Sequence, residues 1–189
     1  MKVSQAYKDQ IRAFEGTYKN SAGLHVAYNK GDTWTIGYGN TYYENGTAVK
    51  QGDTITETRA LRLFSSVLDS LSQEVSRLLT NTVTQRQFDS ICSLVYNIGV
   101  TAFRNSTILI KINRNPKDPA IATEFKRWIY SKGKVITGLV NRRAKESDYY
   151  FGLSNDSIVP TNMGFIALVI IVFVIFKLKR NVKQEINNS

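Results

Sequence analysis

The chain has 189 residues, of which 42% are hydrophobic and 21% charged, so it can bury the core of one ordinary domain. Its formal net charge of +10 favours an anionic partner such as an acidic polymer, a membrane surface or nucleic acid. No recognisable nucleic-acid-binding motif accompanies this charge, so nucleic acid is not expected as a partner. Cys92 and His25 are the sole cysteine and histidine, which excludes an intrachain disulfide and a Cys/His zinc site. We therefore expect no metal and no cofactor.

The N-terminal part predicts a short helix followed by a small sheet. Apolar residues recur every three or four positions from Val3 to Phe14, and Gly16 ends this amphipathic helix. Residues 24–43 are rich in β-branched and aromatic residues punctuated by glycine, which is typical of a small antiparallel sheet. Glu15 lies at the end of the predicted helix, twenty residues before Thr35.

The middle of the chain predicts a mainly helical body. Thr54–Glu57 and Thr84–Gln87 both have the form of a capping box, and each precedes an apolar pattern with helical period. The first of these helices runs to Leu79 and the second ends at Gly99. Further helices are expected over 106–113, 118–131 and 137–151. One small sheet followed by many helices indicates the α+β class.

The composition changes abruptly near the C-terminus. Met163–Phe176 is a run of fourteen residues without a charge, apolar on all sides. A bilayer span needs about 20 residues, a length reached if the run extends upstream to Ile158 and flanking lysines snorkel. We expect a domain at 1–153, a linker at 154–162, a transmembrane helix at 163–178 and a basic tail at 179–189. A buried core helix and an oligomerisation helix are the alternatives.

Glu15 has surroundings that suggest hydrolytic chemistry. It stands at a helix end and is followed by the hydroxyl-bearing, glycine-rich segment 35–41 (TIGYGNT). Glycoside hydrolysis needs a carboxylic acid that protonates the leaving oxygen, and usually a second carboxylate or a positioned water. A cleft that desolvates Glu15 would suit it to the acid role. Considered alone, a glutamate at this place is more often a solvated residue at a helix end.

Short sequence blocks in a fixed order narrow this choice. They are residues 14–16 (FEG), 27–28 (AY), 35–39 (TIGYG), 87–89 (QFD), 96–99 (YNIG), 106–107 (ST), 127–128 (RW) and 138–143 (GLVNRR). Together they resemble the phage-type lysozymes, glycoside hydrolase family 24, over about residues 5–151. The resemblance implies the lysozyme-like α+β fold and a muramidase that cleaves the β-1,4 bond between N-acetylmuramic acid and N-acetylglucosamine. By the same resemblance Glu15 is the general acid, and Thr35 helps to place the attacking water.

One position departs from the family pattern. The family usually has an aspartate two residues after the tyrosine that Tyr28 matches, and this chain has Lys30 there. Asp32 is the nearest carboxylate, and the turn at Gly31 could bring it to the cleft as the functional aspartate. The alternative is an ordinary aspartate at a hairpin tip.

Three further residues are candidates for binding or support. Arg142 and Arg143 resemble the arginine pair of the family, and one of them could orient Glu15 through an ion pair, unless both are solvated on a helix face. Asn97 either hydrogen-bonds sugar or caps its helix, and capping is favoured. His25 is expected on the surface of a strand.

The resemblance and the C-terminal run together predict how the protein works. We expect a membrane-anchored enzyme, in the membrane of a lipid-containing virion or of the host cell, with peptidoglycan and the membrane as partners. It would lyse bacterial cell walls during phage release or entry, and its positive body would be attracted to the anionic wall. The absent family aspartate motivates the alternative, a non-catalytic peptidoglycan-binding or structural membrane protein on a lysozyme fold.

Overall fold

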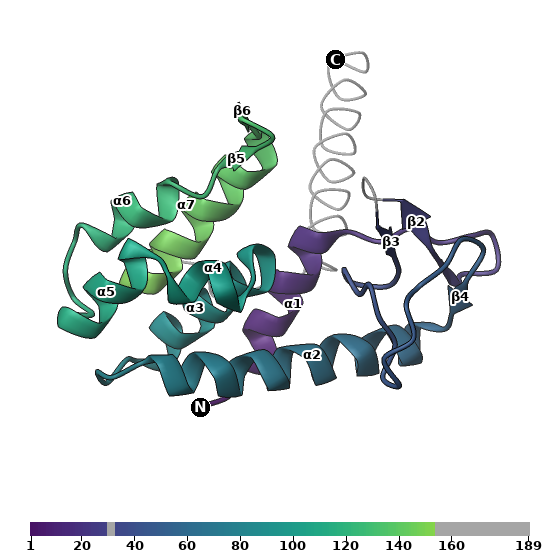
Figure 1. Ribbon diagram of the computed structural model, residues 1–189, viewed down its shortest axis with the longest axis horizontal. Helices are drawn as coiled ribbons and strands as arrows, with labels where there is room; N and C mark the ends of the chain where they lie inside the picture. Colours follow the sequence, from purple (N-terminus) through teal and green to yellow (C-terminus); the bar gives the residue numbers. More distant parts are fainter. Residues whose placement is uncertain (30–32, 154–189) are drawn as a thin grey trace, which may run out of the picture. The chain divides into compact units, whose positions relative to one another are not determined.

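The computed structural model describes residues 1–29 and 33–153, which lie in one compact unit. Its elements, in chain order, are α1 (Gln5–Glu15), β1 (His25–Val26), β2 (Tyr28–Asn29), β3 (Trp34–Thr35), β4 (Thr54–Ile55), α2 (Glu57–Leu78), α3 (Gln85–Ile98), α4 (Val100–Arg104), α5 (Thr107–Arg114), α6 (Ile121–Lys126), β5 (Tyr130–Ser131), β6 (Lys134–Val135) and α7 (Thr137–Phe151). Strands β1 to β4 gather at one end, helices α3 to α7 at the other, and the long α2 runs beside both (Figure 1). The predicted α+β class is confirmed.

The strands form small antiparallel pairs in place of the single predicted sheet. β1 pairs with β4, β2 with β3, and β5 with β6. The β1–β4 pairing places His25 opposite Ile55. Thr54 is therefore part of a strand, and α2 begins two residues later than predicted, with Thr56 as its N-cap. His25, predicted to be exposed, is fully buried by this pairing.

Helix termini follow the capping signals of the sequence. The hydroxyl of Ser4 accepts from the backbone N–H of Tyr7 at the start of α1, and Gly16 at φ +66° ends that helix. The predicted capping box of Thr84 and Gln87 is formed at the start of α3. Both ends of α1 are thus fixed by the residues that flank it, which sets the position of Glu15.

The helix predicted over 118–131 is wrong in its second half. α6 ends at Lys126, and a short hairpin of β5 and β6 follows. Lys132 and Gly133 both have positive φ, 48° and 75°, which is the backbone of a tight two-residue hairpin turn. The short α4 was not predicted.

The core surrounds α3. Every residue from Gln87 to Val95 is buried, so this helix is covered on all faces. It packs against α2, α4 and α7. Large side chains of α3 and its neighbours, each with at most 1% exposure, make up this core; they include Phe64, Phe88, Phe103, Phe125, Ile91 and Ile108. Each contributes roughly 1.5–3 kcal/mol by burial, and together they make α3 a rigid support for polar residues at its C-terminal end.

The prediction of a membrane-spanning helix needs correction. Within residues 1–29 and 33–153, none of the helices combines the length and the apolar character that a bilayer crossing requires. α2 has 22 residues, but it carries charged side chains from Glu57 to Arg77. The predicted segment 163–178 lies outside the described residues. The finding on the described helices contradicts the predicted fold class with a transmembrane helix and the single-pass membrane location drawn from it.

Candidate active site

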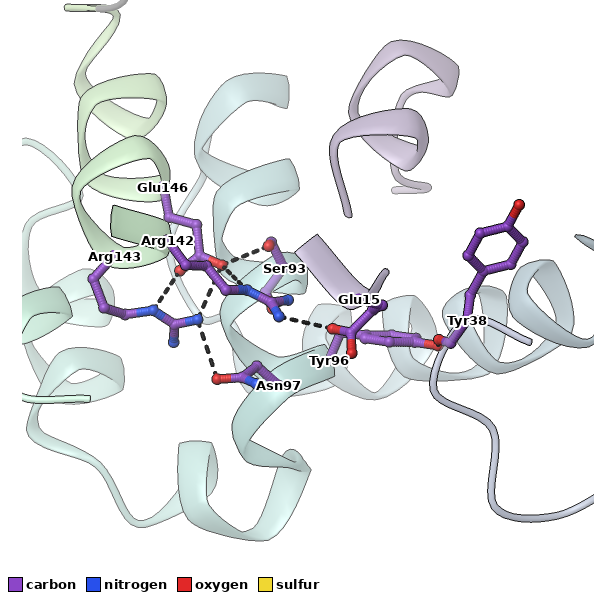
Figure 2. A network of polar contacts seen from close by, with 8 residues as sticks. All are labelled: Glu15, Tyr38, Ser93, Tyr96, Asn97, Arg142, Arg143 and Glu146. Carbon is purple, nitrogen blue, oxygen red and sulfur yellow. Dashed lines mark hydrogen bonds and ion pairs between the residues drawn. The ribbon is translucent and has the colours of Figure 1, made fainter. Parts of the chain in front are cut away.

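Glu15 lies at the C-terminal end of α1 with its side chain only 7% exposed. One carboxylate oxygen, Oε1, accepts a hydrogen bond from Arg142 Nη1 at 2.7 Å. The other, Oε2, faces Gly39 so closely that a Cβ on that glycine would lie 3.2 Å from it. The carboxylate is therefore held between a helix of the body and the glycine-rich segment that follows β3 (Figure 2).

A buried network of charges supports Arg142. Glu146 lies one helical turn along α7 and is completely buried; its Oε1 accepts from Arg142 Nε at 3.0 Å and from the Ser93 hydroxyl at 2.6 Å. Arg143 Nε lies 2.9 Å from Glu146 Oε2. Two guanidinium groups and two carboxylates, with Glu15 as the second, thus balance within the network, which a low-dielectric interior requires. Glu146 was not predicted as a site residue. It lies four residues after Arg142 and three after Arg143, a spacing that indicates ion pairs on one helix face.

Arg142 is the direct partner of Glu15. Its Nη2 also donates to the backbone carbonyl of Ser93 at 3.1 Å, and its guanidinium lies 4.9 Å from the centroid of the Phe14 ring. Burial disfavours its charge, but the carboxylates of Glu146 and Glu15 outweigh that effect and raise the pKa of Arg142. It remains a cation with a fixed orientation, since all three of its guanidinium nitrogens are engaged.

Arg143 and Asn97 form a second branch of the network. Arg143 Nη2 donates to Asn97 Oδ1 at 3.2 Å and to Glu146 at the same distance. Burial lowers the pKa of Arg143, and the positive charge of Arg142 lowers it further, to about 10. Arg143 is therefore still charged at neutral pH. Gly99, whose N–H bonds to the Val95 carbonyl, ends α3. Asn97 is therefore a partner of Arg143, and not the helix cap that its position suggested.

Tyr96 approaches Glu15 from α3. Its hydroxyl donates to the backbone carbonyl of Tyr38 at 2.6 Å. Its ring also lies next to Gly39: a Cβ added to that glycine would be 3.7 Å from the ring atom Cε1. Burial and then the negative charge of Glu15 raise the pKa of Tyr96, which therefore stays a neutral donor. The α3 helix and the 38–39 backbone are thereby joined beside the carboxylate.

Thr35 is buried on β3, with 3% exposure, directly opposite Tyr28 of β2. Cross-strand partners of this kind share one face of the hairpin. Burial and the charge of Glu15 raise the pKa of Tyr28, so this face lies within electrostatic reach of the carboxylate. Asp32 lies outside the described residues.

An open cleft of about 610 Å³ is lined by Gly39 and Tyr96, which both approach Glu15. Asn40, Tyr42, Glu74 and Arg104 also belong to its lining. Such a mixture of aromatic and hydrogen-bonding groups suits a sugar chain, which presents apolar ring faces and many hydroxyls. In the part of the chain that the structure describes, no group of three or more His, Cys, Asp or Glu side chains is placed to hold a metal ion.

The α+β fold and a buried carboxylate beside an open cleft define a protein of the lysozyme class. The family model of the phage lysozymes matches residues 12–146, and the chain belongs to that family. The resemblance read from the sequence is confirmed.

Individual relatives agree with this assignment. The chain is 38% identical over 146 residues to the endolysin of Bacillus phage PZA, an alignment that covers 77% of this chain and 54% of that protein. The alignment with the endolysin of Bacillus phage B103 covers 52% of that protein. The chain therefore spans about half the length of these two curated relatives.

Solved structures show the same fold. The muramidase domain of SpmX from Asticaccaulis excentricus superposes with a TM-score of 0.67 at 28% identity, covering 79% of this chain and 97% of that domain. The endolysin from Escherichia coli O157:H7 phage FAHEc1 gives a TM-score of 0.66 at 32% identity, covering 85% of this chain and 98% of the other.

Proposed function

We propose that this protein is a peptidoglycan hydrolase, a muramidase that cleaves the β-1,4 bond between N-acetylmuramic acid and N-acetylglucosamine in bacterial cell walls. The observation that carries the proposal is the placement of Glu15, a 7% exposed carboxylate that is held by Arg142 and lies against Gly39, which lines a 610 Å³ cleft. Membership of the phage lysozyme family and the likeness to endolysins and a muramidase domain support it.

In this proposal Glu15, in its protonated form, donates to the glycosidic oxygen as the bond breaks. The contacts with Arg142 and Gly39 restrict the carboxyl group to one orientation, so that little positional freedom is lost on reaching the transition state. Arg142 also places a positive charge beside the carboxylate that remains after the proton has left. Tyr96 and the Gly39 backbone shape the adjoining wall of the cleft.

The test is clearance of purified cell walls, followed as loss of turbidity. Wild type is expected to clear the suspension, and Glu15→Gln is expected to be slower by at least about 100-fold because the amide cannot donate the required proton. Glu44→Gln is the matched control: it makes the same change at an exposed carboxylate, which pairs with Arg59 at 3.5 Å. Equal clearance by wild type and Glu15→Gln, or none by either, would contradict the proposal.

We further propose that Thr35, with Asp32, places the attacking water on the other side of the bond. Thr35 is buried opposite Tyr28, whose pKa is raised by burial and by the charge of Glu15, and this supports its part. Thr35→Val keeps the shape of the side chain and removes the hydroxyl, and should slow clearance; an unchanged rate would remove Thr35 from the mechanism. Asp32→Asn in the same assay decides whether Asp32 replaces the family aspartate.

A further inference from the structure

Glu57, the first residue of α2, gathers three other segments around its carboxylate. Oε2 lies 2.7 Å from Lys19 Nζ and 2.7 Å from His25 Nε2, while Oε1 accepts from the Tyr38 hydroxyl at 2.5 Å. These partners come from the segment before β1, from β1 itself and from the glycine-rich segment after β3. Glu57 therefore links the start of α2 to three segments of the small-strand region: the one before β1, β1 itself and the one after β3.

The charge of Glu57 holds this cluster together. Burial raises its pKa, but the hydrogen bonds from Lys19, Tyr38 and His25 outweigh that effect and lower the pKa to about 2. A carboxylate in the first turn of α2 is favoured further by the helix dipole. Near neutral pH Glu57 is thus an anion and can accept all three hydrogen bonds at once.

Tyr38 is fixed in this cluster by more than its hydroxyl. The fully buried His25 ring packs edge-on against the Tyr38 ring, with 5.4 Å between centroids. The guanidinium of Arg12 lies 5.4 Å from the centroid of the same ring. The tyrosine ring therefore has contacts on more than one side, and its hydroxyl points at Glu57.

The backbone of Tyr38 belongs to the active site. Figure 2 shows its ring directed away from Glu15, while its carbonyl accepts the 2.6 Å hydrogen bond from Tyr96. The next residue, Gly39 at φ +97°, lies against Glu15 Oε2. A displacement of Tyr38 would consequently move both groups that border the carboxylate on the side of the cleft.

We propose that Glu57 is a positioning residue for the reaction: by holding the Tyr38 side chain, it fixes the Gly39 backbone and the Tyr96 ring against Glu15. The inference rests on the muramidase function proposed above. Glu57 does not touch the Glu15 carboxylate and acts only through Tyr38.

The test is a double-mutant cycle of Glu57→Gln and Tyr38→Phe, with kcat and KM measured on a soluble oligosaccharide of alternating N-acetylmuramic acid and N-acetylglucosamine. Each single change should lower kcat by about 10-fold and leave KM within about twofold, because it loosens the geometry of Glu15 without removing a sugar contact. The double variant should be no slower than the slower single variant, since both changes break one link. If the two residues acted independently, their effects on kcat would instead multiply.

The matched control is Glu44→Gln, which removes an acid that pairs with Arg59 on the surface at 3.5 Å; it should leave kcat unchanged. Thermal unfolding shows that each variant is folded at the assay temperature. Should Glu57→Gln not fold, Tyr38→Phe decides alone, because it keeps the ring and its packing. An inactive wild type would contradict the proposed function, whereas an active wild type with unchanged kcat in Tyr38→Phe, or with multiplying effects, would overturn this inference alone.

Discussion

Two polar networks of different construction border Glu15. The helix-side network lies on the neighbouring helices α3 and α7 and consists of Ser93, Arg142, Arg143 and Glu146. Its ionic side chains are at most 5% exposed. The sheet-side network, Glu57 with Lys19, His25 and Tyr38, draws on four segments, and its carboxylate is 40% exposed. The first contacts the Glu15 carboxylate directly, and the second reaches it through a backbone.

The difference in exposure separates their roles. Charges inside the protein cannot be rehydrated when a partner is lost, so each member of the helix-side network is needed for stability. Partly exposed charges are screened by water, so the sheet-side network contributes little to stability for the number of its contacts. In the proposal above, its hydrogen bonds position the glycine-rich segment that contains Gly39, so the network acts on the geometry of the active site more than on stability.

Removal of the central carboxylate of the helix-side network should have the largest effect. Glu146→Gln leaves two buried guanidinium groups with one anionic partner, Glu15, and should lower the free energy of unfolding by about 3–5 kcal/mol. Urea denaturation measures this loss. Glu74→Gln is the control, since it breaks a surface pair with Arg104 at 3.7 Å and should cost at most about 1 kcal/mol. Similar losses in the two variants would mean that burial does not distinguish the networks.

The two networks also differ in what the sequence predicted of them. Arg142 and Arg143 were found because the block 138–143 resembles the phage-type lysozymes, and Asn97 because it lies two residues before a helix-ending glycine. Nothing local connects His25 with Glu57, which are 32 residues apart. The pairing of β1 with β4 brings them together, and a two-residue strand has too few side chains to show its pairing or its buried face in the sequence.

The same contrast holds for the fold. Both termini of α3 and the C-terminal end of α1 were predicted, because caps are local interactions between a residue and nearby backbone groups. The start of α2 and the β5–β6 hairpin were missed, because tertiary pairing and two positive φ angles overrode the helical pattern there. For Glu15 the chain position was predicted, but its contact with Gly39 required the tertiary structure.

A smaller effect is expected where the sheet-side network meets Glu15. Gly39→Ala forces a side chain into a backbone at φ +97° and places its Cβ 3.2 Å from Glu15 Oε2. Stability should fall by about 1–3 kcal/mol, and cell-wall clearance by about 10- to 100-fold. Gly46→Ala, at φ +78° with open space around its Cβ, should lose comparable stability and keep its activity. Equal activity losses would show that strain, and not the contact with Glu15, is responsible.

The smallest effect concerns the charge of Glu57 and depends on pH. Its pKa falls from an ordinary 4.5 to about 2 in the folded protein. A lowered pKa means that the ionised group stabilises the fold fully above about pH 4.5 and loses that contribution as the pH falls toward 2. Since the side chain is 40% exposed, screening reduces the contribution to about 1 kcal/mol. Urea denaturation should therefore find Glu57→Gln less stable than wild type by about that amount near pH 6, with the difference shrinking below pH 4.5. A difference that stays constant with pH would assign the stabilisation to shape and packing, and the sheet-side network would then resemble an ordinary core contact more than a set of charges.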